Sequence, residues 1–152
     1  FVAAEDINEP GLQKTTLEAL FREADIVSLH LSSGPHSDGL VNAALLNSMK
    51  PGALLVNTAR GAVIDEPALC EVLAARPDLS AALDVYETEP LPAGHPLEKL
   101  PNVLLMPHMG GPTVDRRLAV TRSVTQDIRR FLAGQPMSCE ISRSYAAKMS
   151  AY

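Results

Sequence analysis

Short apolar runs alternate with amphipathic segments along this chain, and this alternation predicts a repeated strand–helix pattern. The apolar runs are expected as strands: ADIVSLHL (24–31), ALLVNTA (53–59), SAALDV (80–85) and NVLLMP (102–107). Between them, apolar positions at helical spacing predict helices over about 16–23, 42–49 and 66–75. Strands that alternate with helices pair in parallel through right-handed crossovers, so the expected fold is α/β with a parallel sheet.

Residues that cap helices stand at two of the expected helix starts. Thr15, with Glu18 three residues later, fits a capping box for the helix over 16–23. Asp65 is the expected N-cap of the helix over 66–75. The buried stripe of that second helix is expected to consist of Leu69, Val72 and Leu73.

The last third of the chain holds a proline-rich segment, a long helix and a mixed tail. Residues 86–101 contain four prolines and are expected as a surface loop. Helical spacing predicts a helix over about 113–132, and Gly134 is expected to end it. The tail 137–152 has no clear pattern. The apolar stripe expected on the long helix consists of Leu118, Val124, Ile128, Phe131 and Leu132.

Composition narrows the class of protein. The chain has 152 residues, of which 46% are hydrophobic and 20% charged, with a net charge of −5. Because the chain is negatively charged and has no blocks of basic residues, the sequence argues against a surface that binds nucleic acid or an anionic membrane. No apolar run is long enough for a membrane-spanning helix. Cys70 and Cys139 form no CxxC pattern, which favours a reducing, cytoplasmic compartment over a disulfide scaffold.

Three polar side chains follow apolar runs and could carry chemistry. Arg60 follows ALLVNTA, Glu89 is the third residue after ALDVY, and His108 ends NVLLMPH. The carboxyl ends of parallel strands open into a crevice, so these residues are expected at one edge of the sheet. Arg60 could hold a carboxylate through two hydrogen bonds, and His108 could exchange a proton with an alcohol or carbonyl. Gly61 is expected to allow a tight turn after Arg60.

The carboxylates leave alternatives open. Glu89 could orient His108, but Glu87 is two residues away and competes for this role by composition. Either one could equally be a solvated loop residue. Asp84, near the end of the third apolar run, could meet a ligand in the crevice or could cap a turn.

The remaining histidines are weaker candidates. His36 and His95 lie in expected loops, and His30 lies in an apolar run where a satisfied core histidine is the default reading. The spacing of these three does not fit a metal site. The sequence also contains no GxGxxG fingerprint, no phosphate-binding GxxxxGK[ST] loop and no HExxH or GxSxG motif.

Three motifs in order give the chain a family resemblance. MKPGALLVNTARGAVIDEPAL, AALDVYETEPLP and LPNVLLMPHMGG resemble the NAD-dependent D-isomer-specific 2-hydroxyacid dehydrogenases, over about residues 16–134. The resemblance implies a Rossmann-like doubly wound parallel sheet, present here in part. It also implies hydride transfer between NAD(H) and a 2-keto or D-2-hydroxy acid, with NADP not excluded.

The resemblance assigns roles to particular residues. It implies that Arg60 binds the substrate carboxylate and carbonyl, that His108 is the acid/base, and that Glu89 rather than Glu87 pairs with His108. Asp84 would contact the nicotinamide side. The implied cofactor contacts are Thr58, Ala59, Arg60, Asp84, His108 and Gly111. Metal ligands are not implied.

The resemblance also implies a domain organisation. Residues 1–112 would be the C-terminal part of an NAD-binding domain, 113–134 a long helix returning to the substrate domain, and 135–152 a tail. The opening FVAAEDI resembles the stretch after the acidic residue that reads the adenine ribose, so the chain is expected to be the C-terminal half of a homodimeric enzyme. The alternatives are a catalytically silent fragment, or an NAD-sensing or partner-binding module. The particular 2-keto acid stays open.

Overall fold

The computed structural model describes residues 11–143, which divide into two compact units after Met109. The opening FVAAEDI and the end of the tail from residue 144 lie outside the described residues. The division lies three residues before the boundary expected from the sequence, and that boundary stays a prediction.

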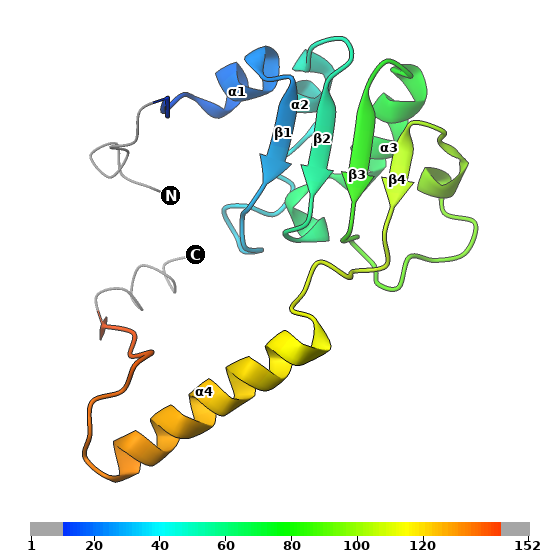
Figure 1. The fold of residues 1–152 in the computed structure, drawn as a ribbon. Helices are drawn as coiled ribbons and strands as arrows, with labels where there is room; N and C mark the ends of the chain where they lie inside the picture. Colours follow the sequence, from blue (N-terminus) through cyan, green and yellow to red (C-terminus); the bar gives the residue numbers. More distant parts are fainter. Residues whose placement is uncertain (1–10, 144–152) are drawn as a thin grey trace. The chain divides into compact units, whose positions relative to one another are not determined.

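The first unit is built on a four-stranded parallel sheet in the order β1-β2-β3-β4 (Figure 1). The strands are β1 (Ile26–Leu29), β2 (Leu54–Asn57), β3 (Ser80–Leu83) and β4 (Val103–Leu105). Their last residues pair in one register, Leu29 with Asn57, Asn57 with Leu83, and Leu83 with Leu105. The parallel α/β sheet predicted from the sequence is therefore confirmed, and all four strands end at the same edge.

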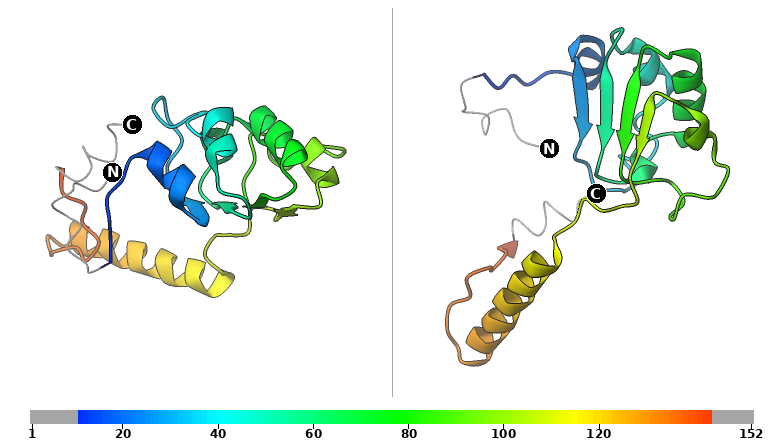
Figure 2. Two further views of the ribbon diagram at one scale, coloured as in Figure 1. Left: turned by 90° about the horizontal axis from the view of Figure 1, so that it is seen from above. Right: turned by 45° about the vertical axis from the view of Figure 1, so that its right-hand side comes forward.

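Three helices cover one face of this sheet (Figure 2). They are α1 (Leu17–Glu23), α2 (Ala43–Ser48) and α3 (Glu66–Ala75). Successive right-handed crossovers in one direction leave their helices on the same side. Among the described residues the opposite face is less covered, and Ile26 and Leu104 are 62% and 60% exposed.

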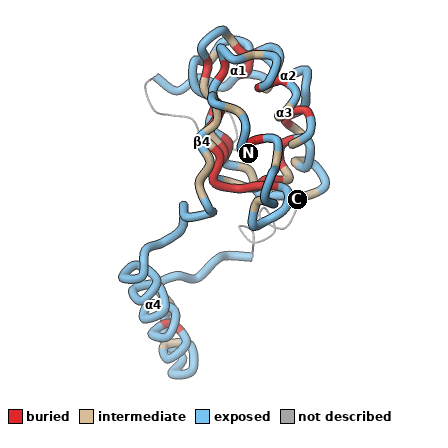
Figure 3. The backbone as a smooth tube through the Cα atoms, turned by 90° about the vertical axis from the view of Figure 1, so that its right-hand side faces the viewer, coloured by how far each residue is buried: buried red, intermediate tan, exposed pale blue. Residues whose placement is uncertain are grey.

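The hydrophobic core lies between these helices and the sheet, where Figure 3 shows the buried backbone of the first unit. Leu69, Val72 and Leu73 are buried on the inner side of α3, as the sequence predicted. From the sheet, Leu55 and Leu83 pack into the same cluster. Alternate strand residues thus supply one side of the core, as expected for a sheet with one covered face.

The helix caps confirm one expectation and correct another. Asp65 is the N-cap of α3, and its Oδ1 accepts a hydrogen bond from Ala68 N at 3.1 Å. The N-cap of α1 is Thr16 and not Thr15, since Thr16 Oγ1 accepts from Ala19 N at 3.1 Å. Two adjacent threonines offer the same hydroxyl, and the backbone conformation decides which one meets the free N–H groups of the first turn.

The segment 86–101 is more ordered than a plain surface loop. It begins with the buried Tyr86 and contains the 3₁₀ helix η3 (Pro96–Lys99), in which Leu97 is fully buried. Leu91 is partly buried against the same core. The prolines shape this segment, while its few apolar side chains attach it to the body of the first unit.

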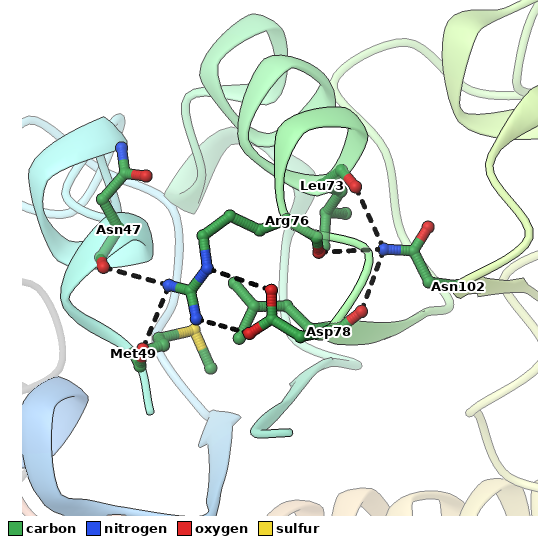
Figure 4. Close-up of polar contacts among 7 residues, drawn as sticks. Asn47, Met49, Leu73, Arg76, Asp78 and Asn102 are labelled. Atoms are coloured by element: carbon green, nitrogen blue, oxygen red, sulfur yellow. Dashed lines mark hydrogen bonds and ion pairs between the residues drawn. The ribbon is translucent and has the colours of Figure 1, made fainter. Parts of the chain in front are cut away.

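A polar network closes the amino end of the sheet (Figure 4). Arg76, at the end of α3, donates to the carbonyls of Asn47 and Met49, both at 3.1 Å, and pairs with Asp78 at 2.6 Å. Asn102 Nδ2 donates to three carbonyls, those of Leu73, Arg76 and Leu79. Most of these contacts satisfy carbonyls that the ends of α2 and α3 leave free, and the bond to Leu79 O lies directly before β3.

The second unit contains α4 (Val114–Leu132), with Thr113 as N-cap. Gly134 has a φ of 66° after the helix end, as expected for the residue that terminates it. The apolar stripe expected from the sequence is exposed within the described residues, as Figure 3 shows for most of the helix.

Asp127 is the one buried residue of α4 and binds the chain that follows the helix. It accepts hydrogen bonds from the backbone N–H and the hydroxyl of Ser138 and from Cys139 N. The bonds from Ser138, followed by those from Cys139 and Arg130, hold the pKa of the Asp127 carboxyl well below its ordinary value. Residues 138–139, for which the sequence predicted no structure, are thus fixed on α4. Within residues 11–143, no helix combines the length and the apolar character needed to cross a membrane.

Candidate active site at the carboxyl edge of the sheet

The sequence-predicted site residues of the first unit lie just beyond the aligned strand ends. Thr58, Ala59 and Arg60 follow β2, Asp84 follows β3, and His108 comes three residues after the end of β4. The aligned register makes these segments neighbours, because β2, β3 and β4 are adjacent in the sheet. Residues distant in sequence are therefore brought to one edge, as in other open parallel sheets.

Asn57, at the end of β2, shapes the segment that carries Arg60. Its side chain is fully buried, Nδ2 donates to Arg60 O at 2.9 Å, and Oδ1 accepts from Ala59 N at 3.0 Å. Both polar ends of the amide are thus used on one tight turn. Asn57 was not among the site residues predicted from the sequence. Its signal was a polar residue at the end of an apolar run, where the backbone leaves the sheet.

Arg60 is exposed and its guanidinium donates to the neighbouring Ala59 O at 2.6 Å. Within residues 11–143 it forms no ion pair, although its positive charge contributes to the environment of Glu89. A fixed cation with free donors at a strand end is suited to a carboxylate ligand, which can accept two parallel hydrogen bonds from it.

The side chains of Glu89 and His108 are in direct contact at this edge. Glu89 Oε2 lies 2.5 Å from His108 Nδ1, and Glu89 Oε1 accepts from Tyr86 N at 3.1 Å. The hydrogen bonds from His108 and from Tyr86 N hold the pKa of the Glu89 carboxyl below its ordinary value of 4.5. With Nδ1 engaged by a carboxylate, His108 has Nε2 for another partner.

Glu87, the competing carboxylate of the sequence analysis, lies differently. Its side chain is exposed, and its backbone N donates to Glu66 Oε2 at 3.0 Å. The contact with His108 is made by Glu89, two residues further along. The choice between the two, left open by composition, is decided by how the chain turns after Tyr86. A catalytic role for Glu89 stays a prediction.

His108 has an unusual backbone conformation. Its φ is 50°, in the left-handed region that non-glycine residues rarely adopt. The following Met109 N donates to Asp84 Oδ1 at 2.8 Å, and Asp84 is 1% exposed. The buried Asp84 thus holds the turn in which the strained histidine sits. Strain kept by surrounding contacts is frequent at functional sites.

Tyr86 connects the two sides of this edge and was not among the site residues predicted from the sequence. Its hydroxyl lies 2.7 Å from Met106 O and 3.1 Å from Leu83 O. Burial raises the pKa of the Tyr86 phenol above its ordinary value of 10.0. The side chain therefore joins the end of β3 to the segment that leads to His108, while its backbone N–H binds Glu89.

A cavity of about 520 Å³ opens beside the pair. His108 and Glu89 lie on its polar side, and Glu98 adds a second carboxylate. Its walls are otherwise mostly apolar. The lining residues are Tyr86, Glu89, Pro90, Leu91, Glu98, Leu105, Met106, Pro107 and His108. The titratable pair therefore borders a concave surface, which is the usual setting of a small-molecule site.

The other sequence candidates lie elsewhere. His30 is exposed and hydrogen-bonds Ser28 Oγ at 2.9 Å, so the expectation of a buried core histidine was wrong, because β1 ends one residue before it. His95 pairs with Glu66 at 3.3 Å. Gly111 belongs to the second unit. Among the described residues, no cluster of His, Cys, Asp and Glu could hold a metal ion, and Cys70 and Cys139 are free.

The fold and this edge define a class: a Rossmann-like half-sheet whose carboxyl edge presents an arginine and a histidine–carboxylate pair. A comparison with protein families agrees with this description. Residues 2–110 match the model of the "D-isomer specific 2-hydroxyacid dehydrogenase, NAD binding domain". The chain belongs to this family of oxidoreductases, and the matched part is its NAD-binding domain.

Two curated relatives illustrate the sequence similarity. The chain is 39% identical over 126 residues to a glyoxylate reductase of Thermofilum pendens, covering 83% of this chain and 37% of the relative. It is 38% identical over 136 residues to a D-3-phosphoglycerate dehydrogenase of Synechocystis, covering 90% of this chain and 24% of the relative. The chain therefore spans between a quarter and two fifths of the length of these two relatives.

Solved structures carry the same fold. The apo form of D-mandelate dehydrogenase from Rhodotorula graminis aligns with a TM-score of 0.75 at 35% identity, over 86% of this chain and 38% of that one. A D-isomer specific 2-hydroxyacid dehydrogenase from Xanthobacter autotrophicus, in complex with NADPH and MES, aligns with a TM-score of 0.69 at 37% identity. The latter match covers 83% of this chain and 51% of that one.

Proposed function

We propose that this chain belongs to an oxidoreductase that interconverts a 2-keto acid and a D-2-hydroxy acid with NAD(H), and that it supplies the residues that exchange the proton. The observation that carries the proposal is the contact between Glu89 Oε2 and His108 Nδ1 at the sheet edge that also presents Arg60. Family membership supports the reaction class, and relatives named as glyoxylate reductase and D-3-phosphoglycerate dehydrogenase support small anionic substrates.

The residues beyond the strand ends fit the nicotinamide side of the cofactor. Thr58 and Ala59 follow β2 at the carboxyl edge, and the buried Asp84 follows the adjacent β3. When bound, the cofactor supplies or accepts the hydride. The sequence has no GxGxxG fingerprint for the pyrophosphate, so the proposal assigns to this chain only contacts at the reacting end. A solved relative bound to NADPH leaves NADP as an alternative to NAD.

His108 exchanges the proton in this proposal. Glu89 binds Nδ1, which leaves Nε2 to face the oxygen on C2 of the substrate. In the reducing direction, Nε2–H donates its proton to the forming alcohol oxygen. In the oxidising direction, neutral Nε2 accepts the alcohol proton. Glu89 stabilises the charged imidazole and keeps the ring in one orientation.

Arg60 binds the substrate carboxylate. Its exposed guanidinium offers parallel donors that match a carboxylate. In the same position it stabilises negative charge that develops on the C2 oxygen, an effect of about 3 kcal/mol for comparable oxyanion donors. The carboxylate common to all 2-keto acids would thus be bound here, while the choice among them lies with other contacts.

A silent or partner-binding role is the second candidate. The observation that favours it is the less covered sheet face, where Ile26 and Leu104 are more than half exposed. Such a surface favours association, either with a second chain or with further structure. In the complete enzyme we propose a homodimer. A titration of NADH fluorescence with the purified protein separates a cofactor binder from a protein that does not bind it.

The test of the proposed function is NADH oxidation with glyoxylate and with longer 2-keto acids as substrates. Two matched variants make it specific, Glu89→Gln and Glu87→Gln. Both remove one carboxylate from the same segment, but only Glu89 contacts His108. The proposal expects a lower kcat in Glu89→Gln and no change in Glu87→Gln. Equal loss in both variants, or turnover insensitive to either, would contradict it.

A further inference from the structure

We propose that Gly61 is a positioning residue of this site. Because it has no side chain, the backbone after Arg60 can lie directly against the Tyr86–Glu87 peptide, and this contact sets the separation between Arg60 and the Glu89–His108 pair. The inference deepens the proposed function and rests on it for the activity measurement. It also makes a structural prediction that does not depend on activity.

The contact at Gly61 leaves no room for a side chain. Gly61 is buried, and a Cβ added to it would lie 1.9 Å from both the carbonyl carbon and the oxygen of Tyr86 and 2.5 Å from Glu87 N. Its φ is not positive, so the tight turn expected from the sequence is not what requires glycine here. The requirement is the close approach of two backbone segments.

The Arg60 side of this contact is firmly held. Asn57 Nδ2 binds Arg60 O, and Gly61 begins the 3₁₀ helix η2 (Gly61–Val63). Gly61 O accepts from Ile64 N at 3.0 Å. The carbonyls of both Arg60 and Gly61 are therefore engaged, so the loop cannot move away without losing hydrogen bonds.

The Tyr86 side is held as well, by groups that belong to the candidate site. Tyr86 N donates to Glu89 Oε1, and the Tyr86 hydroxyl binds Met106 O, two residues before His108. A displacement of the Tyr86–Glu87 peptide therefore reaches both members of the Glu89–His108 pair. The contact at Gly61 thus couples Arg60, which follows β2, to the Glu89–His108 pair, whose members follow β3 and β4.

A methyl group at Gly61 would have to separate the two segments by more than about 1 Å, because buried atoms have little free space around them. A misplacement of about 1 Å in a catalytic site can lower the rate by about 100-fold. The expected effect of Gly61→Ala is therefore a fall in kcat of about that size in a protein that still folds.

The matched control is Gly52→Ala. Gly52 lies in the turn before β2, at the opposite end of the sheet, and a Cβ there would meet nothing within 4 Å. Its φ is 80°, so alanine strains the backbone at this position without touching the site. Gly52→Ala thus separates the consequences of a general loss of stability from those of a displaced catalytic edge.

Two measurements test the proposal on both variants. NMR titration of the Glu89 carboxyl carbon reports its contacts with His108 and Tyr86, and kcat and KM report the reaction. Gly61→Ala should move the titration of Glu89 towards its ordinary value and lower kcat, while Gly52→Ala should leave both unchanged. A folded Gly61→Ala variant with the wild-type titration would overturn the proposal, whatever its activity.

A second variant decides the question if Gly61→Ala does not fold. Tyr86→Phe keeps the buried ring but removes the hydroxyl that binds Met106 O, so it loosens the other side of the same contact. The proposal expects the Glu89 titration to shift in the same direction, by a smaller amount. An unchanged titration in Tyr86→Phe would overturn it. An inactive wild-type protein would count against the proposed function alone, since the titration remains measurable.

Discussion

The two ends of the sheet use the same kinds of residues in opposite ways. At the amino end, the Arg76 side chain is 21% exposed and donates to two carbonyls and to both oxygens of Asp78. At the carboxyl end, Arg60 is exposed and, within the described residues, donates to the carbonyl of its neighbour. The Arg76 guanidinium is bound on several sides within the fold, whereas the Arg60 guanidinium is exposed, and we propose that its remaining donors bind a ligand.

Two asparagines, Asn102 at the amino end and Asn57 at the carboxyl end, differ in the same way as the two arginines. Asn102 binds three carbonyls that end α3 and begin β3, so it joins elements of the scaffold. Asn57 binds the backbone of residues 59 and 60, so it shapes the loop that presents Arg60. We expect that the amino end contributes mainly stability and that the carboxyl end holds the residues of the candidate site on that support.

The largest effect expected at the carboxyl end follows from removing the imidazole. His108→Ala should lower kcat by about 100-fold to 10,000-fold, the usual contribution of a general acid/base. NADH binding, followed by fluorescence, should persist because the substitution leaves the other strand ends in place. Wild-type turnover in this variant would dismiss the acid/base role.

Substitution of the two arginines makes the comparison between the ends direct. Arg60→Ala should lower kcat/KM by about 100-fold to 1000-fold, since a carboxylate ligand and the developing oxyanion lose their donor. Its melting temperature should stay close to that of the wild type, because the exposed side chain has little to do with folding. An Arg60→Ala variant with normal kcat/KM would show that Arg60 is an ordinary surface residue without a role in substrate binding.

At the amino end we expect the opposite result, a loss of stability without a loss of catalysis. Arg76→Ala should lower the free energy of unfolding by about 2 kcal/mol, because several carbonyls and Asp78 lose a charged donor. Urea unfolding measures this loss. Wild-type kcat per folded molecule is expected alongside it. If Arg76→Ala instead impairs catalysis in the folded state, the separation of the two ends fails.

The smallest expected effect is a dependence of stability on pH at the amino end. The hydrogen bond from Arg76 holds the pKa of Asp78 below its ordinary value of 3.8. A lowered folded-state pKa stabilises the fold above the ordinary pKa, and this contribution is lost as the pH falls through the lowered value. Asp78→Asn should therefore be less stable than the wild type at about pH 7, and this difference should shrink towards about pH 2. Melting temperatures across that range test this, and a constant difference would contradict it.

Much of the fold could be predicted from local sequence patterns. Each expected strand and helix is present, because burial on one face of a helix or sheet imposes a period on the apolar residues. The misplaced features are those where neighbouring residues offer the same chemistry, such as Thr15 beside Thr16. His30 was misplaced because an apolar run continues past the last paired residue of β1.

For the candidate site, the sequence determined which residue types stand at the strand ends, and the motifs gave the family to which the chain belongs. Taken by themselves, the residues left Glu87 and Glu89 as alternatives, and the family resemblance implied Glu89. Tertiary structure alone decided the contact that Glu89 makes with His108, why residue 61 must lack a side chain, and that Tyr86 joins the two sides of the edge. The physical reason is distance along the chain. A periodic pattern is a property of one segment, whereas these contacts join segments about 20 residues or more apart, whose separation only the register of the sheet and the packing beneath it can fix.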